Sequence, residues 1–208
     1  LKVIDEANAN ISVDSILVQL PLPNHINSNK VIDRISIDKD VDGFNSKNIG
    51  LLALGRPKVI PCTPLGCYKM LESILDLEGK KVIILGRSNI VGKPLSFLLT
   101  NKNATVTLAH SKSKKLKNLC LSSDIIIAAI GKPNFVKKEW VKEKAVIIDV
   151  GINVIEDKHG IRKIVGDVDY EDVIKKVSFI SPVPGGVGPM TIAMLVQNTV
   201  DAAEYQKE

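Results

Sequence analysis

Short apolar runs alternate with amphipathic segments through the middle of the chain. Residues 82–85 are all apolar, a pattern typical of a strand that is buried on both faces of a parallel sheet. Similar runs predict four more strands, at residues 104–109, 124–130, 145–150 and 178–181. Helical segments are predicted between them, at residues 91–102, 114–120 and 137–140. This alternation predicts an α/β fold with a Rossmann-like, doubly wound parallel sheet.

The two ends of the chain have a different pattern. Residues 1–60 contain one predicted strand, at residues 15–20, and two predicted helices, at residues 29–35 and 46–54. The C-terminal segment predicts a long helix over residues 189–205, with apolar residues at helical spacing. We therefore expect two domains. A dinucleotide-binding domain would occupy residues 63–188, and a smaller α/β substrate domain would combine residues 1–62 with the C-terminal helix at 189–208.

The turn after the first predicted strand has features of a phosphate site. Gly86 permits a sharp turn, and a helix that opens near Ile90 would direct free N–H groups and its positive dipole end toward a ligand. Arg87 and Ser88 add a cation and a hydroxyl donor, which suits a pyrophosphate or a phosphorylated ribose. Ser88 stands where the G-x-G-x-x-G fingerprint has its second glycine. The alternative is an ordinary strand-to-helix connection without a ligand.

Three more predicted loops follow the carboxyl ends of the strands, where open α/β sheets bind ligands. They contain His110-Ser111, Gly131-Lys132-Pro133 and Gly151-Ile152-Asn153. The second strand ends without the Asp or Glu that would take the ribose hydroxyls of NAD. Together with Arg87, this ending favours NADP. His110 by itself is equally compatible with a surface loop.

Composition adds limits to this picture. The 208 residues are 45% hydrophobic, enough for one large or two small domains. No apolar run approaches the roughly 18 residues of a membrane helix, so we expect no membrane association. Three cysteines without C-x-x-C spacing indicate a reducing compartment and no zinc site. Cys62 is either a thiol nucleophile or, as base rates favour, a small buried apolar residue.

The chain carries a formal net charge of +5, and residues 112–117 are its densest basic segment. Such a segment can bind a polyanion or form a solvated helix face. Aromatic content is only 4% and no stacking pattern accompanies the lysines, so we expect no nucleic-acid partner.

Three further features suggest ligand contacts without identifying the ligand. Asp42 could bind the amino-pyrimidine edge of a pterin or guanine-like ring through its two oxygens, or it could simply belong to the turn before Gly43. Gln19 could contact a ligand or be an ordinary polar residue at a strand end. The Pro/Gly-rich run at residues 182–189 could line a cleft or form an interdomain hinge.

Taken together, several strings resemble the bifunctional methylenetetrahydrofolate dehydrogenase/methenyltetrahydrofolate cyclohydrolase family over almost the whole chain. The strings are Val-Gln-Leu-Pro-Leu-Pro at 18–23, Asp-Val-Asp-Gly at 40–43, Pro-Cys-Thr-Pro at 61–64, Gly-Arg-Ser at 86–88, Val-Gly-Lys-Pro at 91–94 and Pro-Val-Pro-Gly-Gly-Val-Gly-Pro-Met-Thr at 182–191. The resemblance implies a homodimeric, two-domain enzyme of one-carbon metabolism, whose C-terminal helix returns to the first domain. It would oxidise 5,10-methylenetetrahydrofolate with NADP and hydrolyse the methenyl product to 10-formyltetrahydrofolate, which serves purine biosynthesis.

The resemblance also implies roles for individual residues. Asp42 would hold the pterin ring, and Gln19 would orient a catalytic lysine and the one-carbon unit. Pro184 and Gly185 would line the folate pocket. The residues expected to contact the dinucleotide are Thr63, Gly86, Arg87, Ser88, Ser111, Ile152 and Thr191.

One departure from the family pattern concerns that lysine. The family has a Tyr-x-x-x-Lys pair, and none of Tyr68, Tyr170 and Tyr205 is followed by Lys four residues later. Loss of such an acid–base group commonly costs about 10²–10⁴-fold in rate. Because the chain begins at Leu1 within an expected amphipathic helix, we expect an N-terminally truncated version of an active, cytoplasmic enzyme, with organellar targeting left open. The alternative is a catalytically impaired dinucleotide-binding protein.

Overall fold

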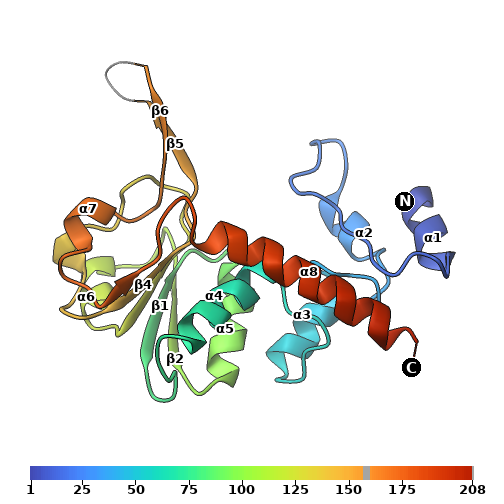
Figure 1. The fold of residues 1–208 in the computed structure, drawn as a ribbon, viewed down its shortest axis with the longest axis horizontal. Helices are drawn as coiled ribbons and strands as arrows, with labels where there is room; N and C mark the ends of the chain where they lie inside the picture. The colour runs from blue at the N-terminus through green and yellow to red at the C-terminus, as the bar shows by residue number, and fades with distance from the viewer. Residues whose placement is uncertain (157–159, 208) are drawn as a thin grey trace.

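The computed structural model describes residues 1–156 and 160–207, and a five-stranded parallel sheet forms its central layer (Figure 1). The strand order is β2-β1-β3-β4-β7, so the chain winds outward from β1 in both directions. The strands are β1 (Lys81–Leu85), β2 (Thr105–Ala109), β3 (Ile125–Ala128), β4 (Val146–Asp149) and β7 (Phe179–Ile180). All five strands predicted from apolar runs are therefore confirmed; β1 begins one residue earlier than predicted, and the other four strands are slightly shorter than predicted.

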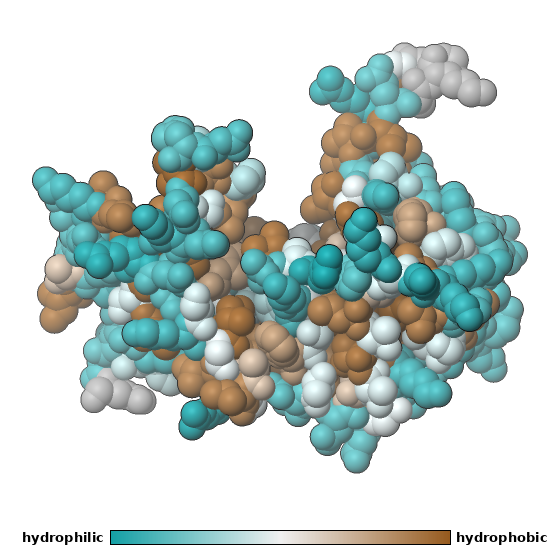
Figure 2. All heavy atoms as spheres, turned by 180° about the vertical axis from the view of Figure 1, so that it is seen from behind, coloured by the Kyte–Doolittle hydropathy of each residue, from teal (hydrophilic) through white to brown (hydrophobic). Residues whose placement is uncertain are grey.

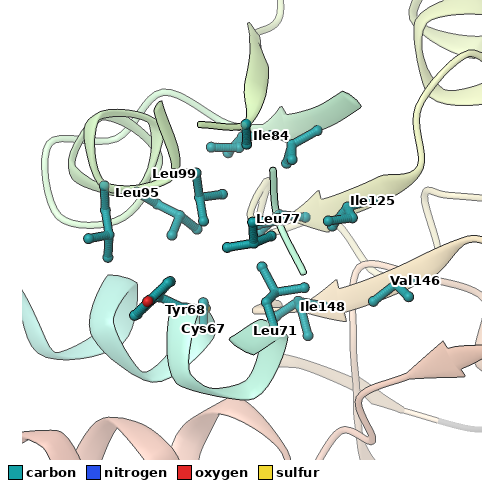
Figure 3. Close-up of a cluster of buried hydrophobic side chains, with 14 of the residues drawn as sticks. Cys67, Tyr68, Leu71, Leu77, Ile84, Leu95, Leu99, Ile125, Val146 and Ile148 are labelled. Carbon is teal, nitrogen blue, oxygen red and sulfur yellow. The ribbon is translucent and has the colours of Figure 1, made fainter. Parts of the chain in front are cut away.

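Helices cover both faces of this sheet. The helices of the whole described chain, including those away from the sheet, are α1 (Lys2–Ala9), α2 (Ser28–Ile32), α3 (Ser46–Ala53), α4 (Cys62–Glu72), α5 (Gly92–Asn101), α6 (Leu116–Leu121), α7 (Tyr170–Val173) and α8 (Val187–Tyr205), with a 3₁₀ turn, η1, at Lys138–Trp140. Ile84 of β1 and Ile148 of β4 pack with Leu71 of α4 and with residues of α5 (Figure 3). The alternate residues Ile83 and Ile147 face the opposite side, toward α6 and η1. Strand side chains alternate between faces, so both faces must be apolar, which explains the continuous apolar runs.

Two elements lie outside this layered body. The antiparallel hairpin of β5 (Asn153–Glu156) and β6 (Arg162–Val165) projects from it (Figure 1). Figure 2 shows hydrophobic residues gathered along the lower part of this arm, where Ile152 and Val154 are 69% and 64% exposed. Helix α8 leaves the sheet and crosses to the side where α1, α2 and α3 lie (Figure 1). No helix among the described residues is long and apolar enough to cross a membrane.

The N-terminal part differs from the prediction. The strand predicted at residues 15–20 is wrong, because only a single bridge between Ile16 and Asp40 forms there. A strand is stable only when a neighbouring strand completes its ladder. The described residues supply no such strand beside residues 15–20, only the bridge to Asp40. The predicted helices at 29–35 and 46–54 are confirmed as α2 and α3, with earlier ends. The domain boundary at residue 62 stays a prediction.

The structure also contains elements that the sequence did not indicate. Helix α4 was not expected, because Pro61, Pro64 and Gly66 resemble a turn, yet proline is tolerated in the first turn of a helix. The hairpin was missed as well, because its strands are largely exposed and short. Helix α5 begins at Gly92 rather than near Ile90.

Two buried carboxylates hold the loops at the carboxyl edge of the sheet. Asp167, which is fully buried, accepts hydrogen bonds from the backbone N–H groups of Ile130, Gly131 and Lys132 at 2.6–2.9 Å, and from Asn153 Nδ2 at 2.9 Å. Asp149, at the end of β4, accepts from the N–H groups of Gly151, Asp167 and Val168, each at 2.9 Å. These bonds tie the loops after β3 and β4 to the segment that follows β6.

The environment of Asp149 also affects its protonation. Burial raises the pKa of Asp149 to about 6, although its three hydrogen bonds from backbone N–H groups act in the opposite direction. A carboxylate at this depth is tolerated because backbone donors replace the lost water. The loops at this edge of the sheet are therefore held by two carboxylates, Asp149 and Asp167, that are almost completely buried.

We expect Asp167→Ala to destabilise the fold strongly. It removes the acceptor shared by the partly buried N–H groups of Ile130, Gly131 and Lys132 and by Asn153 Nδ2, so the free energy of unfolding should fall by about 3–5 kcal/mol. Asp172→Ala is the matched control, since Asp172 is exposed and accepts one bond, from Lys138 N. Urea unfolding followed by circular dichroism measures both. Equal losses in the two variants would contradict the role of Asp167.

Candidate functional site

The strands end in register, which brings four loops to one edge of the sheet. Leu85 of β1 is paired with Ala109 of β2 and Ala128 of β3, and Ala128 is paired with Asp149 of β4. Two cavities, of about 370 Å³ and about 490 Å³, open at the loops that follow these residues. The prediction that these loops share one edge is confirmed.

The first cavity contains the residues expected to bind the nucleotide phosphates. It is lined by Gly86, Arg87, Ser88 and Ser111, together with neighbouring residues that include His110 and Lys132. Arg87 is exposed, and its side chain has no ion pair or hydrogen bond within the part of the chain that the structure describes. Lys132 Nζ lies 5.7 Å from the centre of the Phe135 ring. The cavity thus has an unpaired guanidinium at its rim and no carboxylate among its lining residues.

The turn at Gly86 is built by close backbone packing. Gly86 has a φ of +122°, and a Cβ there would lie 2.1 Å from the carbonyl oxygen of Ala129. A Cβ on Gly92 would lie 2.0 Å from the carbonyl oxygen of Gly86. Both distances are far below van der Waals contact, so only glycine fits either position. These two glycines bring the start of α5 directly against β1 and β3.

Ser88 accepts the N–H groups where helix α5 begins, which corrects one expectation. Its Oγ accepts from the N–H groups of Val91 at 3.1 Å and Gly92 at 3.4 Å, and its carbonyl oxygen accepts from Lys93 N at 3.1 Å. The expectation that the first N–H groups of this helix are free for a phosphate is therefore wrong for these three. A hydroxyl that accepts in this way keeps its own hydrogen to donate. At this turn Arg87 and the Ser88 hydroxyl therefore remain as donors that an anion could use.

The loop after β3 is also less available than its sequence indicates. Gly131 and Lys132 look like part of a phosphate loop, but Asp167 accepts both of their N–H groups.

The lysines in the basic segment at residues 112–117 are exposed.

The second cavity brings together residues from both predicted binding sets. Thr63, Ile152 and Thr191, expected at the dinucleotide, line it together with Pro184 and Gly185, expected at the folate. Thr63 Oγ1 and Thr191 Oγ1 lie 3.0 Å apart. Val91 also lines this cavity, three residues after Ser88 of the first. The turn between β1 and α5 therefore borders both cavities.

Asp42 is half buried in a tight turn that Asp40 organises. Asp40 accepts from the N–H groups of Gly43 and Asn45 and from Asn48 Nδ2. Burial, and next the charge of Asp40, raise the pKa of Asp42 to about 6. Asp42 is thus both a turn residue and a partly desolvated acid, a combination that is common at functional sites.

Cys62 lies beside this acid, with its Sγ 3.9 Å from Asp42 Oδ1. It is buried, and burial followed by the charge of Asp42 raises the pKa of its thiol to about 12. A thiol is nucleophilic only when it is ionised. The interpretation of Cys62 as a small buried residue is therefore favoured over a nucleophile, and all three cysteines are free and buried.

Gln19 is not brought to either cavity. Its side chain is exposed, and its Nε2 donates to the carbonyl oxygen of Leu20 at 3.1 Å. Neither Gln19 nor Asp42 is among the described residues that line the two cavities, and no hydrogen bond joins the two side chains. Their roles stay predictions. Within the described residues, no cluster of His, Cys, Asp or Glu could hold a metal ion.

Sequence analysis missed three residues that hold this site together, namely Asp149, Asp167 and Asn198. An acid at the end of a fully apolar strand, as Asp149 is, was a usable signal. Asn198 lies between Gln197 and Thr199, so nothing in the local sequence distinguishes it from an ordinary polar helix residue. Asp167 gave no local signal, because its backbone partners lie 35–37 residues away and its side-chain partner Asn153 lies 14 residues away.

Comparison with known proteins identifies the family. The family sequence models described as tetrahydrofolate dehydrogenase/cyclohydrolase, NAD(P)-binding domain and catalytic domain match residues 61–207 and 1–42. The bifunctional protein FolD of Campylobacter hominis is 52% identical over 205 residues, which are 98% of this chain and 71% of that protein.

Solved structures agree with this match. The bifunctional FolD methylenetetrahydrofolate dehydrogenase/cyclohydrolase of Campylobacter jejuni is 49% identical with a TM-score of 0.93, over 98% of this chain and 72% of that one. The Trypanosoma brucei enzyme, solved with NADP and an inhibitor, is 36% identical with a TM-score of 0.94, over 100% of this chain and 72% of that one. The chain therefore belongs to the tetrahydrofolate dehydrogenase/cyclohydrolase family.

Proposed function

We propose that this chain oxidises 5,10-methylenetetrahydrofolate by hydride transfer to NADP, and that it hydrolyses the methenyl product to 10-formyltetrahydrofolate. Family membership supplies the reaction. The observation that supports it here is the second cavity, where Thr63, Thr191 and Ile152 lie with Pro184 and Gly185. Hydride transfer requires the nicotinamide and the one-carbon bridge to be in contact, and this cavity gathers both sets of predicted contacts.

The residues of the first cavity fit the phosphorylated ribose of NADP. Arg87 offers a guanidinium that no described residue neutralises, and the end of β2 offers no carboxylate to repel a 2′-phosphate. NADP, when bound, accepts the hydride. The chain's own residues position it, with the phosphates near Arg87 and Ser88 and the nicotinamide end near Thr63 and Thr191.

Asp42 supplies a carboxylate for the substrate. Its two oxygens can accept parallel N–H bonds from an amino-pyrimidine edge, which is the polar edge of a pterin. Partial burial strengthens such a bond, because water competes less for the carboxylate. Gln19 would orient the one-carbon unit from the exposed loop before Pro21.

We also propose that the protein acts as a cytoplasmic homodimer that supplies one-carbon units for purine biosynthesis. The exposed apolar side chains of the hairpin arm, Val154 and Ile164 among them, support a contact with a second copy. The family resemblance supports the metabolic assignment.

The purified chain should reduce NADP when it is given 5,10-methylenetetrahydrofolate, which NADPH absorbance measures directly. Hydrolysis is measured separately, from the loss of methenyltetrahydrofolate absorbance, because the chain has no Tyr-x-x-x-Lys pair. Turnover in the first assay excludes the binding-only alternative. Binding of NADP without any turnover would contradict the proposed function.

Arg87→Ala should weaken the binding of NADP far more than the binding of NAD. Loss of a charge-assisted bond to the 2′-phosphate should raise the KM for NADP by roughly 10- to 100-fold and leave NAD within about 3-fold. Arg56→Ala is the matched control, since Arg56 is exposed and lines neither cavity. Equal losses for both cofactors would remove Arg87 from 2′-phosphate recognition.

The folate-dependent rate should fall as the pH drops through about 6, because the substrate needs the ionised Asp42. The raised pKa favours the protonated acid in the folded chain, so the contribution of Asp42 to stability grows at low pH. Loss of stability on protonation of Asp42 therefore does not explain the lower folate-dependent rate at low pH. Asp42→Asn should bind folate weakly, with no such pH dependence and with NADP binding intact. A wild-type profile that is flat from about pH 5 to about pH 8 would contradict the assignment.

A further inference from the structure

Asn198 is a buried amide in α8 that joins two distant segments of the chain. It is 5% exposed. Its Nδ2 donates to the carbonyl oxygen of Val41 at 2.9 Å and to that of Ile60 at 3.0 Å, and it lies 3.6 Å from Cys62 Sγ. An amide nitrogen has two hydrogens, so these two carbonyl groups use its whole donor capacity.

The two segments that Asn198 joins meet at Asp42. The Val41 carbonyl directly precedes Asp42, and it also accepts from the Cys62 thiol at 3.4 Å. Gly43, with a φ of +71°, packs so closely on the second segment that a Cβ there would lie 2.9 Å from Pro61 N. The Asp42 turn therefore packs against the residues before α4, and Asn198 bonds to both segments.

Helix α8 carries this amide and part of the cavity wall. Thr191, which lines the second cavity, lies seven residues before Asn198, or about 10 Å along an α-helix. Near Thr191 the helix packs tightly against α4, because a Cβ on Gly66 would lie 3.2 Å from Met190 Cβ. An α-helix of this length, packed along one side, is a rigid spacer. The position of Asn198 thus sets how far the Asp42 turn lies from the cavity.

Neighbouring polar side chains on α8 have only local partners. Gln197 Nε2 donates to Asp201 Oδ1, and Thr199 Oγ1 donates to the carbonyl oxygen of Leu195, each one turn away on the same helix. Asn198 instead bonds to two carbonyl groups that lie 138 and 157 residues away in the sequence.

We propose that Asn198 is a positioning residue for Asp42, which fixes the substrate carboxylate relative to the cavity where the hydride is transferred. This inference rests on the proposed function, since it assigns Asp42 to the substrate. Rates of transfer between bound reactants depend steeply on their alignment. Displacement of the turn should therefore impair folate use and spare the cofactor.

Asn198→Leu tests the proposal, because leucine has similar volume and no donor. Gln197→Leu is the matched control on the adjacent, exposed position of α8. We expect Asn198→Leu to raise the KM for 5,10-methylenetetrahydrofolate by at least about tenfold and to keep the Kd for NADP within about twofold. The control should match the wild type in both. Asn198→Asp, which has at most one donor hydrogen, provides a second variant if leucine prevents folding.

Two further measurements separate positioning from general stability. Hydrogen exchange should quicken in residues 40–45 and stay unchanged in β1 and β3. In an Asp42→Asn background, Asn198→Leu should weaken folate binding no further, because a residue that acts through Asp42 has nothing left to position. An unchanged folate KM in an active Asn198→Leu enzyme, or additive losses in the double variant, would overturn the inference. Absence of turnover in the wild type would instead overturn the proposed function.

Discussion

The architecture of the site depends on burying two carboxylates among backbone N–H groups. Asp149 and Asp167 together accept six backbone bonds and one from a side-chain amide. A parallel sheet delivers its strand ends to one edge but leaves the loops free to diverge. Here the loops converge because their N–H groups share acceptors that water cannot reach. This arrangement fixes the cavity walls, and it also occupies the N–H groups of the loop after β3.

A second network of the same kind organises the turn that contains Asp42. Lys39 donates to the carbonyl oxygens of Ala7, Asn8 and Asn10 at the end of α1, while the adjacent Asp40 shapes the turn that presents Asp42. Helix α8 runs from the second cavity, which Thr191 lines, toward the side of the N-terminal helices (Figure 1), and its Asn198 bonds to Val41, next to Asp40. Polar groups buried in this way are costly unless every partner is in place, so they specify geometry more strictly than apolar packing does.

Local patterns predicted the parts of the molecule that local forces determine. The strands were visible because both sheet faces are covered, which makes each strand uniformly apolar. The Gly86-Arg87-Ser88 turn was visible because glycine, a cation and a hydroxyl are adjacent in sequence. The strand at 15–20 failed because pairing, not composition, makes a strand. Asn198 and Asp167 could not be assigned, because their partners lie far away in the chain and no periodicity records such bonds.

The position of the Ser88 hydroxyl has a consequence for the energetics of ligand binding. Its oxygen is held by two N–H groups of the turn into α5, so the hydroxyl has lost rotational freedom during folding. The hydroxyl hydrogen is left to donate, and Ser88 lines the first cavity. An anion in this cavity would therefore meet a donor whose ordering entropy has already been lost, and its affinity would benefit from this preorganisation. Replacing the second glycine of the fingerprint by serine thus exchanges close backbone approach for a rigid donor.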